Sequence, residues 1–128
     1  MYSFSKSSDE KNKQCHHDLQ KVLNAVIKEY DIITITGHRG KEEQEQKLLN
    51  GTSLVAFPHS KHNHFPSLAF DIAPYNKNIK GGVDWDDDRE FCYMAGIVMT
   101  KAKELGINLI WGGRFKNIFD AGHFELAS

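Results

Sequence analysis

The sequence has few cysteines, no long hydrophobic run and almost no net charge. Cys15 and Cys92 are too few for a disulfide scaffold and too far apart for a paired-thiol metal motif. No run approaches the about 20 apolar residues of a transmembrane helix, and the polar N-terminus lacks the apolar segment of a signal peptide. We therefore expect reduced thiols, synthesis in the cytoplasm without a signal peptide, and no membrane insertion.

Charge and length restrict the function classes further. The formal net charge is −1, whereas proteins that cover nucleic-acid phosphates are usually basic, so we expect no nucleic-acid partner. A chain of 128 residues fits one globular domain with its own core. We predict a polar lead-in over residues 1–13, extended or frayed, followed by a single domain over residues 14–128 that is monomeric by default.

Hydrophobic spacing predicts helices that alternate with short strands. Apolar residues at helical spacing between Leu19 and Tyr30 form one face of an amphipathic helix, and a β-branched run over 32–36 predicts a buried strand. Further helices are expected over 41–49 and from 84–88 to 105, further strands over 68–73, 108–111 and 123–126, and a long loop over 52–66. This pattern predicts an α+β fold with a small, mainly antiparallel sheet.

Histidine is frequent, with seven residues in 128, and several lie where neither a core nor a surface needs them. A zinc site takes imidazole and carboxylate ligands and keeps one position open when it is catalytic. His62 or His64, together with Asp71 and His123, could supply such a set; alternatively, these are solvated histidines and a strand-capping aspartate. Asp120 favours the metal site, because a carboxylate beside a metal can move protons during hydrolysis.

Four sequence motifs resemble those of a known group of zinc peptidases. They are TGHRGKEEQ at 36–44, SKHNHFPSLAFDIAPY at 60–75, WGG at 111–113 and DAGHFEL at 120–126. Together they resemble the zinc D-alanyl-D-alanine carboxypeptidases and the phage L-alanyl-D-glutamate endopeptidases. The resemblance runs from about Cys15 to Leu126 and implies a hedgehog/DD-peptidase-like fold, in which helices flank the small sheet. The resemblance predicts that residues 14–128 form a zinc peptidase catalytic domain.

The resemblance implies a role for each matched residue. It places the ligands of a Zn²⁺ cofactor on His62, Asp71 and His123, and the catalytic acid/base on Asp120. Arg39 matches the arginine that binds the scissile carbonyl or a substrate carboxylate. A guanidinium suits that role, because it offers a planar fork of donors to a developing oxyanion.

Other residues are expected around this centre. The resemblance places Gln44, Ser60 and Trp111 at the substrate. Glu125 lies two residues after His123 and shares its face by strand alternation, so we expect it to orient a ligand from behind.

Two departures from the family pattern concern the metal and the substrate. The family separates its histidine and aspartate ligands by seven positions, which fits His64 and Asp71, whereas His62 lies nine positions before Asp71. We prefer His62, because it has the family's Ser-x-His context with a two-residue insertion after it. Arg114 stands where relatives often carry an acidic residue, which could alter substrate preference without affecting the metal.

The resemblance predicts a zinc metallopeptidase that hydrolyses a peptidoglycan stem peptide. The small size, the missing signal peptide and the phage-like loop favour an endolysin that cleaves the L-alanyl-D-glutamate bond and reaches the cell wall through a membrane lesion. The alternatives are a D-alanyl-D-alanine carboxypeptidase, which would need export, and a non-catalytic hedgehog-like zinc-binding module. A metal-dependent nuclease is disfavoured by the near-neutral charge.

Overall fold

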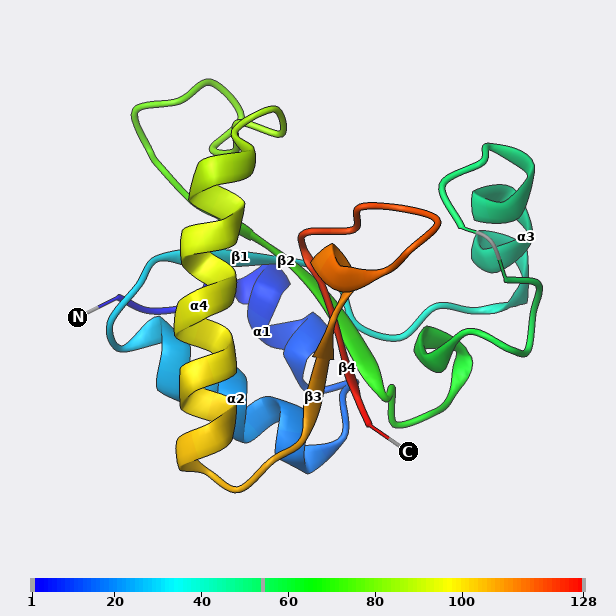
Figure 1. The fold of residues 1–128 in the computed structure, drawn as a ribbon, viewed down its shortest axis with the longest axis horizontal. Coiled ribbons are helices and arrows are strands. Elements are labelled where there is room, and N and C mark those ends of the chain that lie inside the picture. The colour runs from blue at the N-terminus through cyan, green and yellow to red at the C-terminus, as the bar shows by residue number, and fades with distance from the viewer. Residues whose placement is uncertain (1, 54, 128) are drawn as a thin grey trace.

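The computed structural model of this chain describes residues 2–53 and 55–127, which form four helices, four strands and two short 3-10 helices (Figure 1). The helices are α1 (Lys6–Asn12), α2 (His17–Ile27), α3 (Lys41–Leu49) and α4 (Asp88–Glu104), with 3-10 turns η1 (Lys61–Asn63) and η2 (Gly112–Arg114). The strands are β1 (Ile32–Thr36), β2 (Ala69–Pro74), β3 (Leu109–Trp111) and β4 (His123–Leu126). None of the described helices combines the length and apolar character that a membrane crossing needs.

The four strands form one sheet in the order β1-β2-β4-β3, and every pairing is antiparallel. This confirms the predicted α+β fold. In the centre of the sheet, Phe70 of β2 pairs with Phe124 of β4, and both side chains are fully buried. The next pair in the same register is Asp71 with His123, so the sheet itself places two of the predicted metal ligands directly opposite each other.

The core lies between the sheet and the two longer helices. Helices α2 and α4 contact each other, and α4 also contacts β2 and β3. The amphipathic helix predicted from Leu19 onward is α2, and its apolar face is buried, as the amphipathic spacing requires. Helix α4 begins after the acidic residues Asp84, Asp86 and Asp87. The Asp87 side chain accepts a hydrogen bond from the backbone N–H of Glu90, which satisfies one of the free donors at the helix start.

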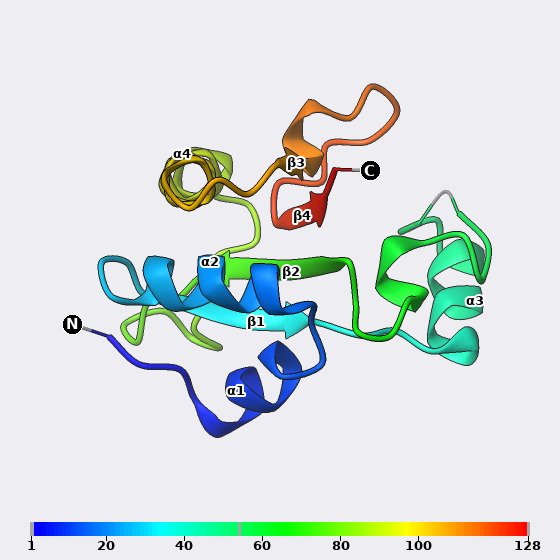
Figure 2. The same cartoon turned by 90° about the horizontal axis from the view of Figure 1, so that it is seen from below.

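The predicted lead-in is wrong over residues 6–12, which form helix α1. Figure 2 shows α1 and α4 on opposite sides of β1 and β2. This helix is held by polar contacts: Ser8 Oγ accepts a hydrogen bond from the backbone of Thr34, and Thr34 Oγ1 donates to Asn12 Oδ1 at 2.6 Å. Ser8 and Asn12 are buried. Because no apolar stripe marks such a helix, hydrophobic spacing could not predict it.

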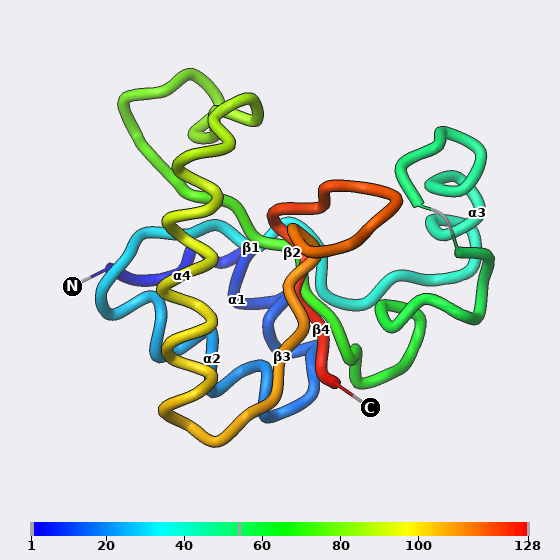
Figure 3. Tube along the Cα trace, viewed as in Figure 1, coloured from blue at the N-terminus to red at the C-terminus, as the bar shows by residue number. Residues whose placement is uncertain are grey.

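The end of the sheet that carries Asp71 and His123 is bordered by irregular segments. One is the loop 112–122 between β3 and β4, which extends from the sheet on the side of α3 in the Cα trace (Figure 3). Its two ends lie against neighbouring backbone: a Cβ on Gly112 would come within 2.3 Å of the Asp120 carbonyl, and one on Gly122 within 2.5 Å of the Ile72 carbonyl. Glycine is therefore needed at both ends to place the loop.

Candidate active site

Three side chains from separate elements converge at this end of the sheet. His62 comes from η1, Asp71 from β2 and His123 from β4. His62 Nε2 lies 3.2 Å from both His123 Nδ1 and Asp71 Oδ2, and His123 Nδ1 lies 3.0 Å from Asp71 Oδ1. The structure thus brings together the three predicted metal ligands as a group that could hold an ion.

The position of His62 follows from the local sequence. Ser60 and Asn63 form a reciprocal capping box, in which the Ser60 hydroxyl accepts from the His62 backbone N–H and the Asn63 side chain accepts from the Ser60 N–H. The Asn63 amide also donates to the Arg39 carbonyl, and the Arg39 N–H donates to the His62 carbonyl. This turn is therefore tied to the segment after β1, which fixes the imidazole against the sheet.

Both histidines use their outer nitrogen for a hydrogen bond to the protein. The Nδ1–H of His62 donates to the Gly37 carbonyl at 2.8 Å, and the Nε2–H of His123 donates to Glu125 Oε1 at 2.9 Å. When both imidazoles are neutral, these bonds set the tautomers and leave a lone pair on each inner nitrogen, facing the Asp71 carboxylate. Three electron-pair donors this close repel one another unless a proton or a metal ion lies between them, and two imidazoles with one carboxylate are a zinc donor set. The residues therefore fit a metal ion.

The same contacts control the charges of the group. Burial raises the pKa of Asp71, but the neighbouring His62 and His123 outweigh burial and hold that pKa well below its usual range. Burial lowers the pKa of His123, whereas hydrogen bonds to Asp71 and Glu125 raise it, to about 9 overall. A metal must displace this proton, so ion binding at neutral pH releases it.

Glu125 contacts a candidate ligand on the side away from Asp71, in agreement with the position predicted for it in the strand. It accepts from His123, and its other oxygen lies 2.9 Å from Lys61 Nζ. Burial raises the pKa of Glu125, while the contacts with His123 and Lys61 lower it further than burial raises it. Lys61 was not predicted, because a loop lysine has no spacing relation to β4 that a sequence could reveal.

Arg39 lies beside the ligand group and is almost completely buried. Its Nη2 is 3.3 Å from Asp71 Oδ2, and its Nη1 donates to Gln44 Oε1 at 2.9 Å. The Gln44 amide in turn donates to Ser53 Oγ at 2.9 Å and to the Val55 carbonyl at 2.6 Å. Gln44 is fully buried, so it holds the guanidinium from behind.

A cleft of about 930 Å³ opens over these residues. Its lining includes Arg39, Ser60, all three candidate ligands and Asp120. Burial and the charge of Asp71 raise the pKa of Asp120, and the nearby His123, His62 and Arg39 lower it less, so the pKa lies above its usual value. A carboxylate with a raised pKa in a cleft beside a metal group is suited to accept and return a proton.

Not every predicted site residue reaches the cleft. Gln44 and Trp111 are absent from its described lining; the Trp111 indole donates to the Ala121 carbonyl at 2.8 Å and packs over Gly113. The structure thus gives Trp111 a role in holding the 112–122 loop. His64, the alternative ligand, is exposed and belongs to no described metal-ligand group, whereas His62 is 1% exposed.

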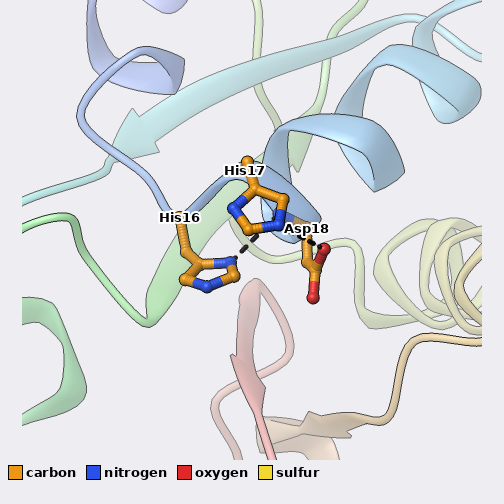
Figure 4. Close-up of side chains that lie close together, drawn as sticks. All are labelled: His16, His17 and Asp18. Atoms are coloured by element: carbon orange, nitrogen blue, oxygen red, sulfur yellow. Dashed lines mark hydrogen bonds and ion pairs between the residues drawn. The ribbon is translucent and has the colours of Figure 1, made fainter.

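A second group of potential ligands among the described residues is His16, His17 and Asp18 (Figure 4). It lies at the start of α2 and contributes nothing to the described cleft lining. His16 Nδ1 accepts a hydrogen bond from the Asp18 backbone, and His17 Nε2 lies 3.1 Å from Asp18 Oδ1. The contacts of this group are those of a helix cap, so the candidate active site is the one at the sheet end.

Comparison with known proteins agrees with this geometry. The family described as phage L-alanyl-D-glutamate peptidase matches residues 1–127. The chain belongs to this family. Membership indicates L-alanyl-D-glutamate peptidase activity on peptidoglycan and confirms the predicted enzyme class.

A solved structure supports the same assignment. The crystal structure of the Serratia marcescens L-Ala D-Glu endopeptidase ChiX is similar to this chain, with a TM-score of 0.80 and 26% sequence identity, over 98% of this chain and 90% of that one. No curated protein sequence gives a significant match.

Proposed function

We propose that this peptidase is a zinc endopeptidase whose ion is held by His62, Asp71 and His123. The observation that carries the proposal is the tautomer arrangement: both outer nitrogens donate to the protein, so both inner nitrogens and the carboxylate present lone pairs to one point. Nitrogen and oxygen ligands in this ratio suit zinc, and three protein ligands would leave a zinc ion one coordination position for water.

The residues around the ligands supply the remaining chemistry. His62, Asp71 and His123 would hold the zinc ion, which would supply Lewis-acid polarisation of the scissile carbonyl and activation of water. Asp120 takes a proton from the attacking water and returns it to the amine of the leaving D-glutamate. Arg39 directs its buried guanidinium at the developing oxyanion, and Gln44 keeps that group in place. Ser60 lines the cleft and holds the turn that carries His62.

The proposal includes where the enzyme acts. We infer that it works on the peptidoglycan of a host cell as a monomeric endolysin and reaches the wall through a membrane lesion. The cleft is formed by one chain, and all proposed catalytic groups come from it, so no second copy is needed to complete the site.

The test is hydrolysis of purified peptidoglycan by the zinc-loaded protein, with and without a chelator. Mass spectrometry should find new L-alanine carboxyl ends and new D-glutamate amines, both absent when the chelator is present. Released D-alanine would instead indicate a carboxypeptidase. Absence of any chelator-sensitive product despite one bound zinc would contradict the proposal and favour a non-catalytic module.

A further inference from the structure

Two large aromatic side chains lie exposed on the lining of the catalytic cleft. Trp85 is 60% exposed and Phe119 is 50% exposed, and both line the cleft that contains the metal-ligand group. Large apolar side chains exposed beside a site commonly mark a binding surface, because water contact is unfavourable for them. The catalytic chemistry assigns neither residue a role.

Both rings are held in place by aromatic neighbours. Trp85 stacks on Phe91 of α4 with ring centroids 6.0 Å apart and planes 30° apart, and Phe91 is itself buried in the core. Phe119 makes an edge contact with Trp111 at 6.2 Å, and the Trp111 indole is fixed by its hydrogen bond to the Ala121 carbonyl. The neighbouring rings restrict the motion of both side chains, so binding a ligand against them costs little side-chain entropy.

The polar side chains around the cleft differ between its two ends. Close in sequence to Trp85 and Phe119, the lining adds Asp88, Lys116 and Asn117, which can hydrogen-bond to hydroxyl and amide groups. The other end is lined by Lys47 together with Thr52, Ser53 and His59, which follow or belong to α3. Figure 1 places α3 and the start of α4 on opposite sides of the molecule. The charges of Asp88 and Lys116 offset each other, so this part of the cleft suits a ligand with apolar faces and no net charge, whereas the part beside α3 carries Lys47 and suits an acidic one.

The substrate of the proposed function also has a sugar at one end and carboxylates at the other. In peptidoglycan, the amino group of the L-alanine is joined through a lactyl group to N-acetylmuramic acid, so a sugar lies one residue before the scissile bond. The leaving side begins with D-glutamate and carries carboxylates. The volume of about 930 Å³ is at the upper end of the ~300–1,000 Å³ usual for ligand sites, which leaves room beyond the two residues at the scissile bond.

We propose that Trp85 and Phe119 form a subsite for the N-acetylmuramoyl group that carries the stem peptide, with the sugar's C–H face against the rings. This inference rests on the proposed function, since it orients the substrate with its sugar toward α4 and its acidic peptide toward α3. It makes the enzyme selective for stem peptides still attached to the glycan strand over free peptides of the same sequence.

The test compares two soluble substrates that differ only in the sugar. One is an N-acetylmuramoyl stem peptide, and the other is the same peptide with an N-acetyl group in place of the muramoyl group. The wild-type kcat/KM should favour the first about tenfold. Trp85→Ala and Phe119→Ala should each lower kcat/KM on the muramoyl peptide about tenfold more than on the N-acetyl peptide, and Trp85→Phe should retain most of the preference.

The matched control is Tyr93→Ala, because Tyr93 of α4 is 63% exposed but is not among the described residues that line the cleft. It should leave both substrates unaffected. Equal kcat/KM for the two substrates in the wild type, or an equal loss on both in the Trp85 and Phe119 variants, would overturn the subsite.

A binding measurement separates this subsite from the proposed function. N-acetylmuramoyl-L-alanine, which contains no bond for the enzyme to cut, is titrated into the zinc-loaded protein, with N-acetyl-L-alanine as the reference. Saturable binding of the first compound alone, weakened about tenfold by Trp85→Ala and unchanged by Tyr93→Ala, supports the subsite even if neither peptide is hydrolysed. Equal binding of both compounds, or none, overturns it even if the peptides are hydrolysed.

Discussion

The Lys61 ammonium lies 2.9 Å from Glu125 Oε2, and the other oxygen of the same carboxylate accepts the Nε2–H of His123. Lys61 directly precedes His62 and also donates to the Leu126 carbonyl at 2.5 Å. One lysine thus connects the turn that bears one candidate ligand to the strand that bears another. Its charge keeps Glu125 ionised, and Glu125 in turn orients His123 with its Nδ1 toward Asp71.

This relationship predicts that Glu125→Gln weakens metal binding. The amide can still accept from His123, but it lacks the charge that stabilises a metal-bound imidazole and it removes the ion-pair partner of Lys61. We expect zinc affinity to fall by about 10- to 100-fold, measured by competition with a chromophoric chelator. Glu45→Gln, on the exposed surface of α3, is the control and should bind zinc as the wild type does. Unchanged affinity in Glu125→Gln would show that the carboxylate does not support the site.

The choice between two neighbouring histidines is open to direct measurement. His62→Ala removes one of three converging ligands, so one-to-one zinc binding should be lost at micromolar protein. His64→Ala changes an exposed side chain two residues away and should keep zinc and activity. Zinc titration of the two variants side by side decides the assignment, and the reverse result would move the ligand to His64.

Asp120→Asn should separate catalysis from metal binding. The side chain lines the cleft but is not in the group of converging ligands, so zinc content and thermal unfolding should match the wild type. Peptidoglycan hydrolysis should fall at least about 100-fold, because an amide cannot accept a proton at neutral pH. Full activity in this variant would exclude Asp120 as the proton carrier.

Arg39→Lys tests the planar donor fork at the cleft. An ammonium cannot bind Gln44 and face Asp71 at once as the guanidinium does, so we expect kcat to fall about 100-fold, the usual cost of removing one oxyanion donor. Arg89→Lys is the matched control, because Arg89 is exposed and is not part of the described cleft lining. A kcat within a few-fold of the wild type in Arg39→Lys would argue that charge alone suffices.

The sequence predicted those parts of the fold that depend on apolar spacing. Helix α2, the strands and helix α4 all bury an apolar face or alternate against the core, and such patterns can be recognised locally. Helix α1 was missed because Ser8 and Asn12 bury polar groups whose partner, Thr34, is more than twenty positions away. A contact of that kind leaves no periodic signal near the helix.

The candidate site also contains residues whose positions the sequence could predict and residues whose positions it could not. The convergence of His62, Asp71 and His123 could be predicted because the motifs contain residue types whose chemistry is specific. The positions of Trp111 and Gln44 were not, since both types fit either a cleft wall or a buried support. Whether a side chain touches substrate or holds another residue depends on packing between elements, which spacing along the chain does not encode.

Buried Cys15 gives a prediction on stability against pH. Burial, and then the charge of Asp71, raise the pKa of its thiol from 9.0 to about 12 in the folded protein. Between these values the unfolded chain has lost the proton and the folded chain has kept it, so the free energy of unfolding falls as pH rises. The stability is fully present below the unfolded pKa and is lost progressively above pH 9.

The Cys15→Ala variant lacks this titration, so its stability relative to the wild type should depend on pH. From pH 8 to pH 10 the wild type should lose about 1.4 kcal/mol more than the variant, measured by urea unfolding in reducing buffer. Cys92 is exposed, and Cys92→Ala should instead follow the wild type at every pH. A pH-independent difference between the wild type and Cys15→Ala would mean that the folded protein lets this thiol ionise, and that the packing of α1 against the end of β1 admits water.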